Sequence, residues 1–247
     1  MNLKLSDFQQ AHEVLKPVVT RTPVDLLPNF SEELGCEIYA KREDLQVVRS
    51  YKIRGAYHLI ASLSEEERQR GIICASAGNH AQGVAFACNK LEIKGKIYMP
   101  VTTPKQKLHQ VKRHGNGWVE IVMVGDTYDQ SHSEALADAE KSGRKLIPPF
   151  DDPKIIMGQG TVGLEMLEQL DTPLDYLFIP VGGGGLAAGL GPVFWSNSPN
   201  TKLIGVEPEG APALKRSLEA GKVVELEEID TFTDGVAVRR IGDLTFP

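Results

Sequence analysis

Cysteine is scarce in this sequence, which contains only Cys36, Cys74 and Cys88 among 247 residues. An odd number of cysteines at unrelated spacings excludes a disulfide framework and a Cys-x-x-Cys metal site. Such usage is typical of a protein of the reducing cytoplasm, where we place this one. Cys74 and Cys88 have apolar neighbours, so we expect them to fill a core rather than to react.

Long apolar runs and an excess of positive charge are also missing. The longest weakly polar run, residues 182–195, is too short and too rich in glycine to cross a bilayer. The N-terminus has no basic region followed by an apolar core, so it is not a signal peptide. With 27 Lys and Arg against 33 Asp and Glu, the net charge is −6, which leaves no basic footprint for nucleic acid or an anionic membrane. We expect neither as a partner.

Short apolar segments alternate with amphipathic helical segments along most of the chain. This alternation predicts an α/β protein with mostly parallel sheets joined by right-handed crossovers. Strands that are apolar throughout indicate helices on both faces. The predicted strands are 71–75, 96–99, 119–124, 145–147, 176–181 and 202–207, and the predicted helices are 79–91, 104–113, 127–141, 159–169 and one from 186. Thr103 and Asp126 are the predicted caps of the second and third helices.

Prolines and acidic residues interrupt this alternation at residues 148–153. Such residues end regular elements, so we predict that the chain crosses between two domains there. The final residues, 242–247, resemble the middle of an element without a stop signal. We therefore expect the natural chain to continue beyond them.

Four consecutive glycines, Gly182 to Gly185, follow an apolar strand and precede a helix that begins near Leu186. Glycines let backbone amides approach an anion closely, and a helix N-terminus adds positive potential, so the pattern predicts a phosphate site. A plain tight turn needs only one or two glycines. The pattern leaves the kind of phosphate open, because Gly183-x-Gly185-x-x-Ala188 with Glu207 also fits a relaxed dinucleotide fingerprint. An NAD-dependent oxidoreductase is therefore an alternative.

Two further segments suggest chemistry. Lys52 stands in the first turn of a predicted helix, where the helix dipole opposes its charge. A dry pocket there would favour the neutral amine that Schiff-base chemistry requires, although most lysines are solvated surface residues. Residues 75–85 open another helix with small residues whose exposed amides suit a carboxylate. Ser76 and His80 lack the Gly-x-Ser-x-Gly turn and the orienting acid of a hydrolase triad, so we assign His80 no catalytic role.

Several motifs in one order resemble those of the biosynthetic threonine dehydratases, over essentially the whole chain. The motifs are Lys41-Arg42-Glu43-Asp44, Ser50-Tyr51-Lys52-Ile53-Arg54-Gly55-Ala56, Ser76-Ala77-Gly78-Asn79-His80-Ala81-Gln82-Gly83, Gly158-Gln159-Gly160-Thr161, the four glycines and Gly205-Val206-Glu207-Pro208. The resemblance implies the tryptophan-synthase-β-like fold of pyridoxal-phosphate enzymes, with two three-layer αβα domains. Residues 1–47 and 148–247 would form the larger domain, and 48–147 a smaller inserted one. It also implies that the glycines hold the monophosphate of pyridoxal 5′-phosphate.

The resemblance also implies roles for individual residues. Lys52 is similar to the Schiff-base lysine, and it is the only catalytic residue that we assign. The residues expected to bind the cofactor are Tyr51 and Gly235 on the two faces of the ring, Asn79 at its 3′-hydroxyl, and Gly182, Gly183, Gly184, Gly185 and Leu186 at its phosphate. The residues expected to bind the substrate carboxylate are Ser76, Ala77, Gly78, Asn79 and His80.

The implied activity is α,β-elimination of L-threonine, and also of L-serine, to give 2-oxobutanoate from threonine together with ammonia, as the first step towards isoleucine. The resemblance further implies a homo-oligomer, a dimer or tetramer. The alternatives are a serine-preferring catabolic dehydratase, a serine racemase or a non-catalytic relative. Ala77 stands where related racemases have a second serine, so we expect little racemisation. Glu207 matches a metal ligand of those racemases, but Ala213 replaces the partner aspartate, so we predict no metal.

Overall fold

The computed structural model describes residues 3–246, and the parts of our predictions that concern residues 1, 2 and 247 lie outside them. The strands are β1 (Val24–Leu26), β2 (Tyr39–Lys41), β3 (Ile72–Ala75), β4 (Gly95–Met99), β5 (Val119–Met123), β6 (Lys145–Leu146), β7 (Tyr176–Pro180) and β8 (Lys202–Val206). The helices are α1 (Leu5–Leu15), α2 (Pro28–Leu34), the 3₁₀ turn η1 (Glu43–Leu45), α3 (Lys52–Ala61), α4 (Glu65–Arg70), α5 (Asn79–Leu91), α6 (Lys105–Gly115), α7 (Tyr128–Ser142), α8 (Pro153–Gln169), α9 (Gly185–Asn197) and α10 (Ala213–Ala220). In this part of the chain, no helix is long and apolar enough to cross a membrane.

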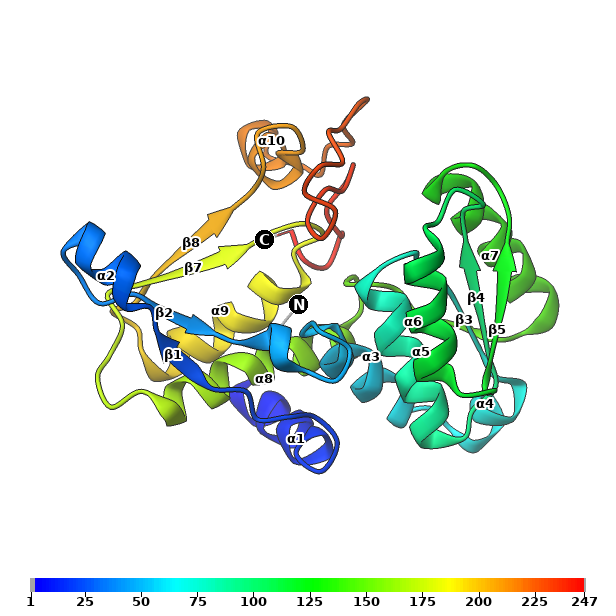
Figure 1. Cartoon of the computed structure of the whole chain (residues 1–247), viewed down its shortest axis with the longest axis horizontal. Helices are drawn as coiled ribbons and strands as arrows, with labels where there is room; N and C mark the ends of the chain where they lie inside the picture. The colour runs from blue at the N-terminus through cyan, green and yellow to red at the C-terminus, as the bar shows by residue number, and fades with distance from the viewer. Residues whose placement is uncertain (1–2, 247) are drawn as a thin grey trace.

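A four-stranded parallel sheet in the order β5-β4-β3-β6 forms the middle of a three-layer unit. Figure 1 shows α5 and α6 on one side of these strands and α7 on the other. Alternate β3 residues explain this, because Ile72 and Cys74 belong to the core under α5, whereas Ile73 and Ala75 pack with Ala135 of α7. All four strands come from residues 72–146, and the bounds of the inserted domain that the resemblance implies stay a prediction.

The other strands form two smaller sheets. β7 and β8 are parallel, and β1 and β2 are antiparallel. Leu177 and Ile179 of β7 point into a core shared with α8 and α9. Tyr176 and Phe178 alternate with them and are 50% and 64% exposed. Among the described residues, helices therefore cover only one face of the β7–β8 sheet.

Helix α8 runs through the middle of the molecule and touches α3 and α9 through glycines. A Cβ atom on Gly158 would lie 2.6 Å from Cα of Gly55 in α3. A Cβ atom on Gly189 of α9 would lie 2.6 Å from the backbone nitrogen of Gly160. The three helices thus pack backbone against backbone, which fixes the beginnings of α3 and α9 relative to one another.

Helix boundaries and caps depart from the predictions at several points. Helix α8 begins at Pro153 rather than 159, because the Asp152 carboxylate accepts from Lys154 N at 2.7 Å and proline is compatible with a first turn. Thr127, rather than Asp126, caps α7 and accepts from Gln130 N. Thr103 caps no helix, because α6 begins at Lys105 after Pro104. The elements that the sequence patterns did not predict are α1, α2, η1, α4, α10, β1 and β2.

Candidate functional site

Lys52 is the first residue of α3, and its side chain is partly buried. Its Nζ donates a hydrogen bond to Pro149 O at 2.8 Å. The same nitrogen lies 5.6 Å from the ring centre of Tyr51 and 5.9 Å from that of Phe150. No acid pairs with this amine among the described residues. Burial therefore lowers the pKa of Lys52 to about 8, so that a substantial fraction is neutral near that pH.

Phe150 joins this lysine to the glycine run. A Cβ atom on Gly183 would overlap the Phe150 ring, and one on Gly185 would lie 2.9 Å from Phe150 Cβ. Because Pro149 and Phe150 are adjacent, they contact Lys52 and the glycines together. Sequence patterns did not indicate Phe150, since an aromatic residue after two prolines has no distinctive pattern.

The amides of the glycine run are free to bind an anion. Gly184 has φ of +87°, a conformation that favours glycine, and caps α9 without a side-chain hydrogen bond. Within residues 3–246, the amides of residues 182–187 donate to no acceptor, although residues 183–186 are buried. Buried amides are nearly always paired in folded proteins. A helix N-terminus with several unpaired amides therefore fits a phosphate.

A distant segment contacts this run and is itself held by Asp151. Thr245 Oγ1 donates to Gly183 O at 2.6 Å. The Asp151 carboxylate accepts from the amides of Asp243 and Leu244 at 3.0 and 2.8 Å. Residues 242–245 are thereby clamped between the glycine run and the segment that follows Pro149. Thr245 is a second residue of the site region that sequence patterns did not indicate.

The segment Ser76–His80 links β3 to α5. Ser76 Oγ accepts from Gly78 N at 3.2 Å, and Asn79, the first residue of α5, is exposed. Gly83 in the next turn faces α3, because a Cβ atom there would lie 3.0 Å from Lys52 O. The predicted carboxylate-binding segment therefore begins the helix that packs against the turn of Lys52.

His80 is turned away from this segment. Its buried ring places Nε2 2.9 Å from Ile147 O, and because a carbonyl only accepts, we assign the proton to Nε2. Burial, together with the charge of Lys52, lowers the pKa of His80 to about 3. The side chain is thus a neutral donor that holds the crossing at residues 147–150. Any substrate contact from His80 has to come from its backbone.

Tyr51 and Gly235 lie at the edges of this region. Tyr51 packs against the core of α8, α9 and β7, and burial raises its pKa to about 12. Gly235 has open space where a Cβ would be. Its neighbour Val236 contacts Gly182, because a Cβ atom on Gly182 would lie 3.0 Å from Val236 O. The same segment reaches α6 and α7 through the ion pairs Asp234–Lys107 and Arg239–Asp129.

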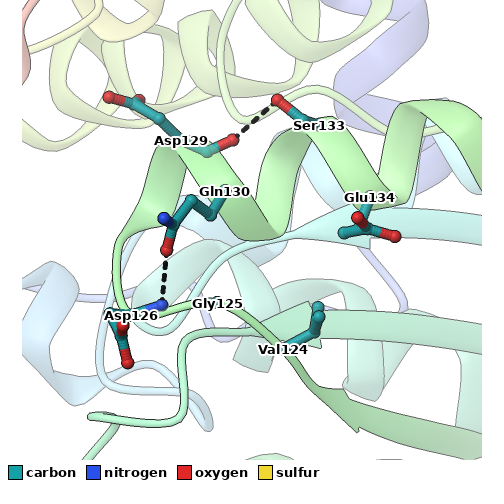
Figure 2. Close-up of a pocket in the computed structure, with 7 residues that line it drawn as sticks. All are labelled: Val124, Gly125, Asp126, Asp129, Gln130, Ser133 and Glu134. Carbon is teal, nitrogen blue, oxygen red and sulfur yellow. Dashed lines mark hydrogen bonds between the residues drawn. The ribbon is translucent and has the colours of Figure 1, made fainter.

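Glu207 and a hollow at the start of α7 lie outside this site. No group of three or more His, Cys, Asp or Glu side chains in residues 3–246 could hold a metal ion. Glu207 instead accepts from the amides of Leu214 and Lys215 at 2.7 and 2.9 Å, at the start of α10. Figure 2 shows a hollow at the start of α7, where Gln130 accepts from Asp126 N. One of its acids, Asp129, is paired with Arg239.

The chain belongs to the family of pyridoxal-phosphate-dependent enzymes, whose model matches residues 15–247. It is 52% identical to the biosynthetic L-threonine dehydratase of Halalkalibacterium halodurans, over 99% of this chain and 59% of that one. It superimposes on threonine deaminase isoform 2 of Solanum lycopersicum (TM-score 0.91, 46% identity, 99% of this chain and 72% of that one). It also superimposes on maize serine racemase (TM-score 0.94, 32% identity, 100% of this chain and 74% of that one).

These comparisons confirm the predicted fold, and family membership disfavours the nicotinamide alternative. The chain spans 59% and 58% of the length of two curated relatives that it matches. The roles that we assigned to individual residues stay predictions. The structure brings Lys52, Tyr51 and the four glycines to one place, with Ser76–His80 at the start of the adjoining helix and Gly235 near Gly182.

The low pKa of Lys52 predicts a stability effect in the cofactor-free chain. Its folded pKa of about 8 lies below the unfolded value of 10.5, so keeping the ammonium in the fold at neutral pH costs free energy. Lys52→Met should raise the free energy of unfolding at pH 7 by about 2–3 kcal/mol, and this gain should shrink as the pH rises from 8 to 10.5. Urea unfolding measures both. Lys105→Met, at the exposed start of α6, is the control. A less stable Lys52→Met at pH 7 would contradict the assignment.

The buried, neutral His80 predicts that the free energy of unfolding depends on pH on the acid side. The unfolded histidine binds a proton near pH 6.5 and the folded one only near 3, so the free energy of unfolding falls as the pH drops through this window. His80→Gln keeps an N–H donor for Ile147 O but cannot titrate. Between pH 7 and pH 5 it should lose about 2 kcal/mol less than the unsubstituted chain. Equal losses in urea titrations would argue against a buried neutral His80, and His109→Gln, at an exposed site on α6, provides the comparison.

Crowding at Gly183 predicts that even one added methyl group destabilises the fold. Gly183→Ala forces the Phe150 ring or the glycine run to move, and it should lower the free energy of unfolding by about 1–3 kcal/mol. Gly205→Ala is the matched control, because its Cβ would lie at an ordinary 3.4 Å from Val181 Cγ2. Thermal unfolding of the two variants should separate them. Equal stabilities would mean that Phe150 does not press on the run.

Proposed function

We propose that the protein containing this chain is a pyridoxal-phosphate-dependent L-threonine dehydratase, which converts threonine to 2-oxobutanoate and ammonia. One observation carries the proposal: an amine with a lowered pKa and a buried run of glycine amides, unpaired within residues 3–246, both lie against Pro149 and Phe150. An aldehyde cofactor with a phosphate requires this pair of features. The 52% identity to a relative named biosynthetic L-threonine dehydratase supports the substrate.

The residues present fit the cofactor, and different residues would bind its different parts. Amides of residues 182–187 would hold its phosphate, Tyr51 and Gly235 would flank its ring, and the exposed Asn79 amide would bind its 3′-hydroxyl. Ser76 and the amides of residues 77–80 would hold the substrate carboxylate at the start of α5. When bound, pyridoxal phosphate supplies an electron-withdrawing ring conjugated to the substrate nitrogen.

Lys52 would carry the cofactor and then move the proton. Its amine is the basic group at the centre of the site, and a pKa of about 8 leaves it partly unprotonated at neutral pH. It would accept the proton from Cα of threonine. Pro149 O, 2.8 Å from Nζ, provides a fixed acceptor that orients the ammonium afterwards. His80 stays neutral and bonded to Ile147 O, so it is not a proton carrier in this scheme.

Elimination is favoured over racemisation by Ala77. A racemase must return a proton to the opposite face of Cα, and a methyl group has none to give. The serine racemase alternative, supported by the maize structure, therefore lacks a donor at this position. A preference for serine over threonine would depend on a single methyl group, which is worth about 1–3 kcal/mol of discrimination.

We also propose the wider setting of the protein. The inserted domain would comprise residues 48–147, which carry the whole four-stranded sheet. The protein would act in the cytoplasm as a homo-oligomer. The exposed apolar side chains of Phe178 and Trp195, 64% and 67% accessible, support contact with further polypeptide.

Replacement of Lys52 tests the proposal. In the complete natural protein loaded with pyridoxal phosphate, borohydride should fix the cofactor on the peptide that contains Lys52, and threonine should yield 2-oxobutanoate. Lys52→Ala should abolish the labelling and lower turnover by at least about 10²–10⁴-fold, because both the attachment and the base are lost. Peptide mapping and a ketoacid assay measure these results.

Lys105→Ala is the control, since Lys105 also begins a helix but is exposed. It should retain labelling and turnover. Turnover that survives in Lys52→Ala, or label on another lysine, would refute the role of Lys52. Labelling without any ketoacid from threonine or serine would leave a cofactor-binding protein of another activity.

A further inference from the structure

A buried cluster of charges lies directly behind the turn of α3 that carries Lys52. Arg54 is fully buried and contacts two carboxylates, each with two hydrogen bonds. Its Nε and Nη2 donate to Glu43 at 2.8 Å each. Its Nη1 and Nη2 donate to Glu165 at 2.7 and 2.9 Å, and Nη1 also donates to Thr161 Oγ1 at 3.2 Å. All five donors of the guanidinium are thus used.

A second cation completes the cluster. Lys41 Nζ donates to Glu165 Oε2 at 2.7 Å, to Thr22 O at 2.7 Å and to Gln169 Oε1 at 2.9 Å. Lys41 and Glu165 are only 6% and 1% exposed. Burial alone would raise the pKa of Glu165, but the hydrogen bonds and charges of Arg54 and Lys41 outweigh it and hold the pKa below its usual value. Two cations and two anions therefore balance.

Stability alone does not account for such a cluster. Moving charges out of water costs free energy that their attraction only partly returns, and an apolar core of the same volume would do as well. What the cluster provides is direction, because a planar guanidinium held by two carboxylates permits one orientation. The four side chains come from β2, η1, α3 and α8, so they tie α3 to the body of the molecule.

The cluster constrains the place of Lys52. Arg54 is two residues after Lys52, and its backbone nitrogen donates to Tyr51 O at 3.0 Å within the same turn. Gly55 N donates to Gln159 Oε1 of α8 at 3.2 Å, and its Cα faces Gly158. A slide or rotation of α3 would break these contacts and move Nζ away from Pro149 O.

We propose that Arg54, held by Glu43 and Glu165, is a positioning residue that aims Lys52 at Phe150 and the glycine run. It touches neither substrate nor cofactor and acts through the rotation and height of the first turn of α3. The expected effect of Arg54 on kcat rests on the proposed function. Its effect on the pKa of Lys52 can be measured without that function.

Arg54→Lys tests the idea, because it keeps the buried charge and removes the planar fork. In the holoenzyme we expect kcat to fall by about 10–100-fold, as for a small misplacement of a reacting group, with little change in KM for threonine. In the cofactor-free protein, pH-dependent acetylation of Lys52 should show its pKa shifted from about 8 towards 10.5. Borohydride labelling of Lys52 should become slower.

Arg21→Lys is the matched control. Arg21 pairs with Glu168, three residues after Glu165 on the same helix, but both side chains are 54% exposed. This variant should leave kcat, the acetylation profile and the labelling rate unchanged. If Arg54→Lys only lowers the melting temperature and leaves the pKa of Lys52 and kcat as they were, the cluster is merely structural and the proposal is overturned.

A milder variant covers the case in which Arg54→Lys does not fold. Thr161→Val removes one acceptor of the five hydrogen bonds and keeps both carboxylates. It should shift the acetylation profile of Lys52 in the same direction by a smaller amount, and an unchanged profile would overturn the proposal. Failure of the proposed function is recognised separately, because the unsubstituted holoenzyme would then form no ketoacid while the acetylation test still decides the role of Arg54.

Discussion

The close contact of three helix backbones is the constraint on which the site depends. Gly55 of α3 meets Gly158 of α8, and Gly160 of α8 meets Gly189 of α9, with no room for a Cβ at any of these contacts. Lys52 begins α3 and the glycine run leads into α9, so this packing sets the separation of amine and anion cradle. Phe150, just before α8, lies close to both of them.

Two lysines, Lys41 and Lys52, differ in how well their surroundings stabilise the ammonium group. Burial lowers the pKa of Lys41, and the hydrogen bonds to a carboxylate, a carbonyl and an amide oxygen offset part of this effect. Among the residues that the structure describes, Lys52 has only the carbonyl of Pro149 as a hydrogen-bond partner, so its charge is less well stabilised. Nearby His80 gives no help, since it is neutral and engaged with Ile147 O. The same side chain thus serves as a structural cation in one place and as a group able to lose its proton in another.

Local patterns predicted a large part of this arrangement. The alternation of elements predicted the parallel sheet, and α5 has the predicted bounds 79–91, because apolar periodicity and the preceding loop are properties of neighbouring residues. The start of α8 was missed because Asp152-Pro153 suits either a loop or a helix cap. Phe150, Thr245 and the partners of Arg54 could not be predicted, since Lys52 and Pro149 are 97 residues apart and Arg54 and Glu165 are 111 apart. Only the folded topology decides such pairs.

The hydrogen bond from Thr245 to Gly183 has a consequence for the order in which the molecule assembles. The threonine is 62 residues further along the chain than the carbonyl that it binds. Since synthesis releases a protein from its N-terminus, Lys52, Phe150 and the four glycines all leave the ribosome well before their clamp. A nascent chain can form the four-stranded sheet early, yet it has to wait for residues 242–245 before the anion cradle is closed.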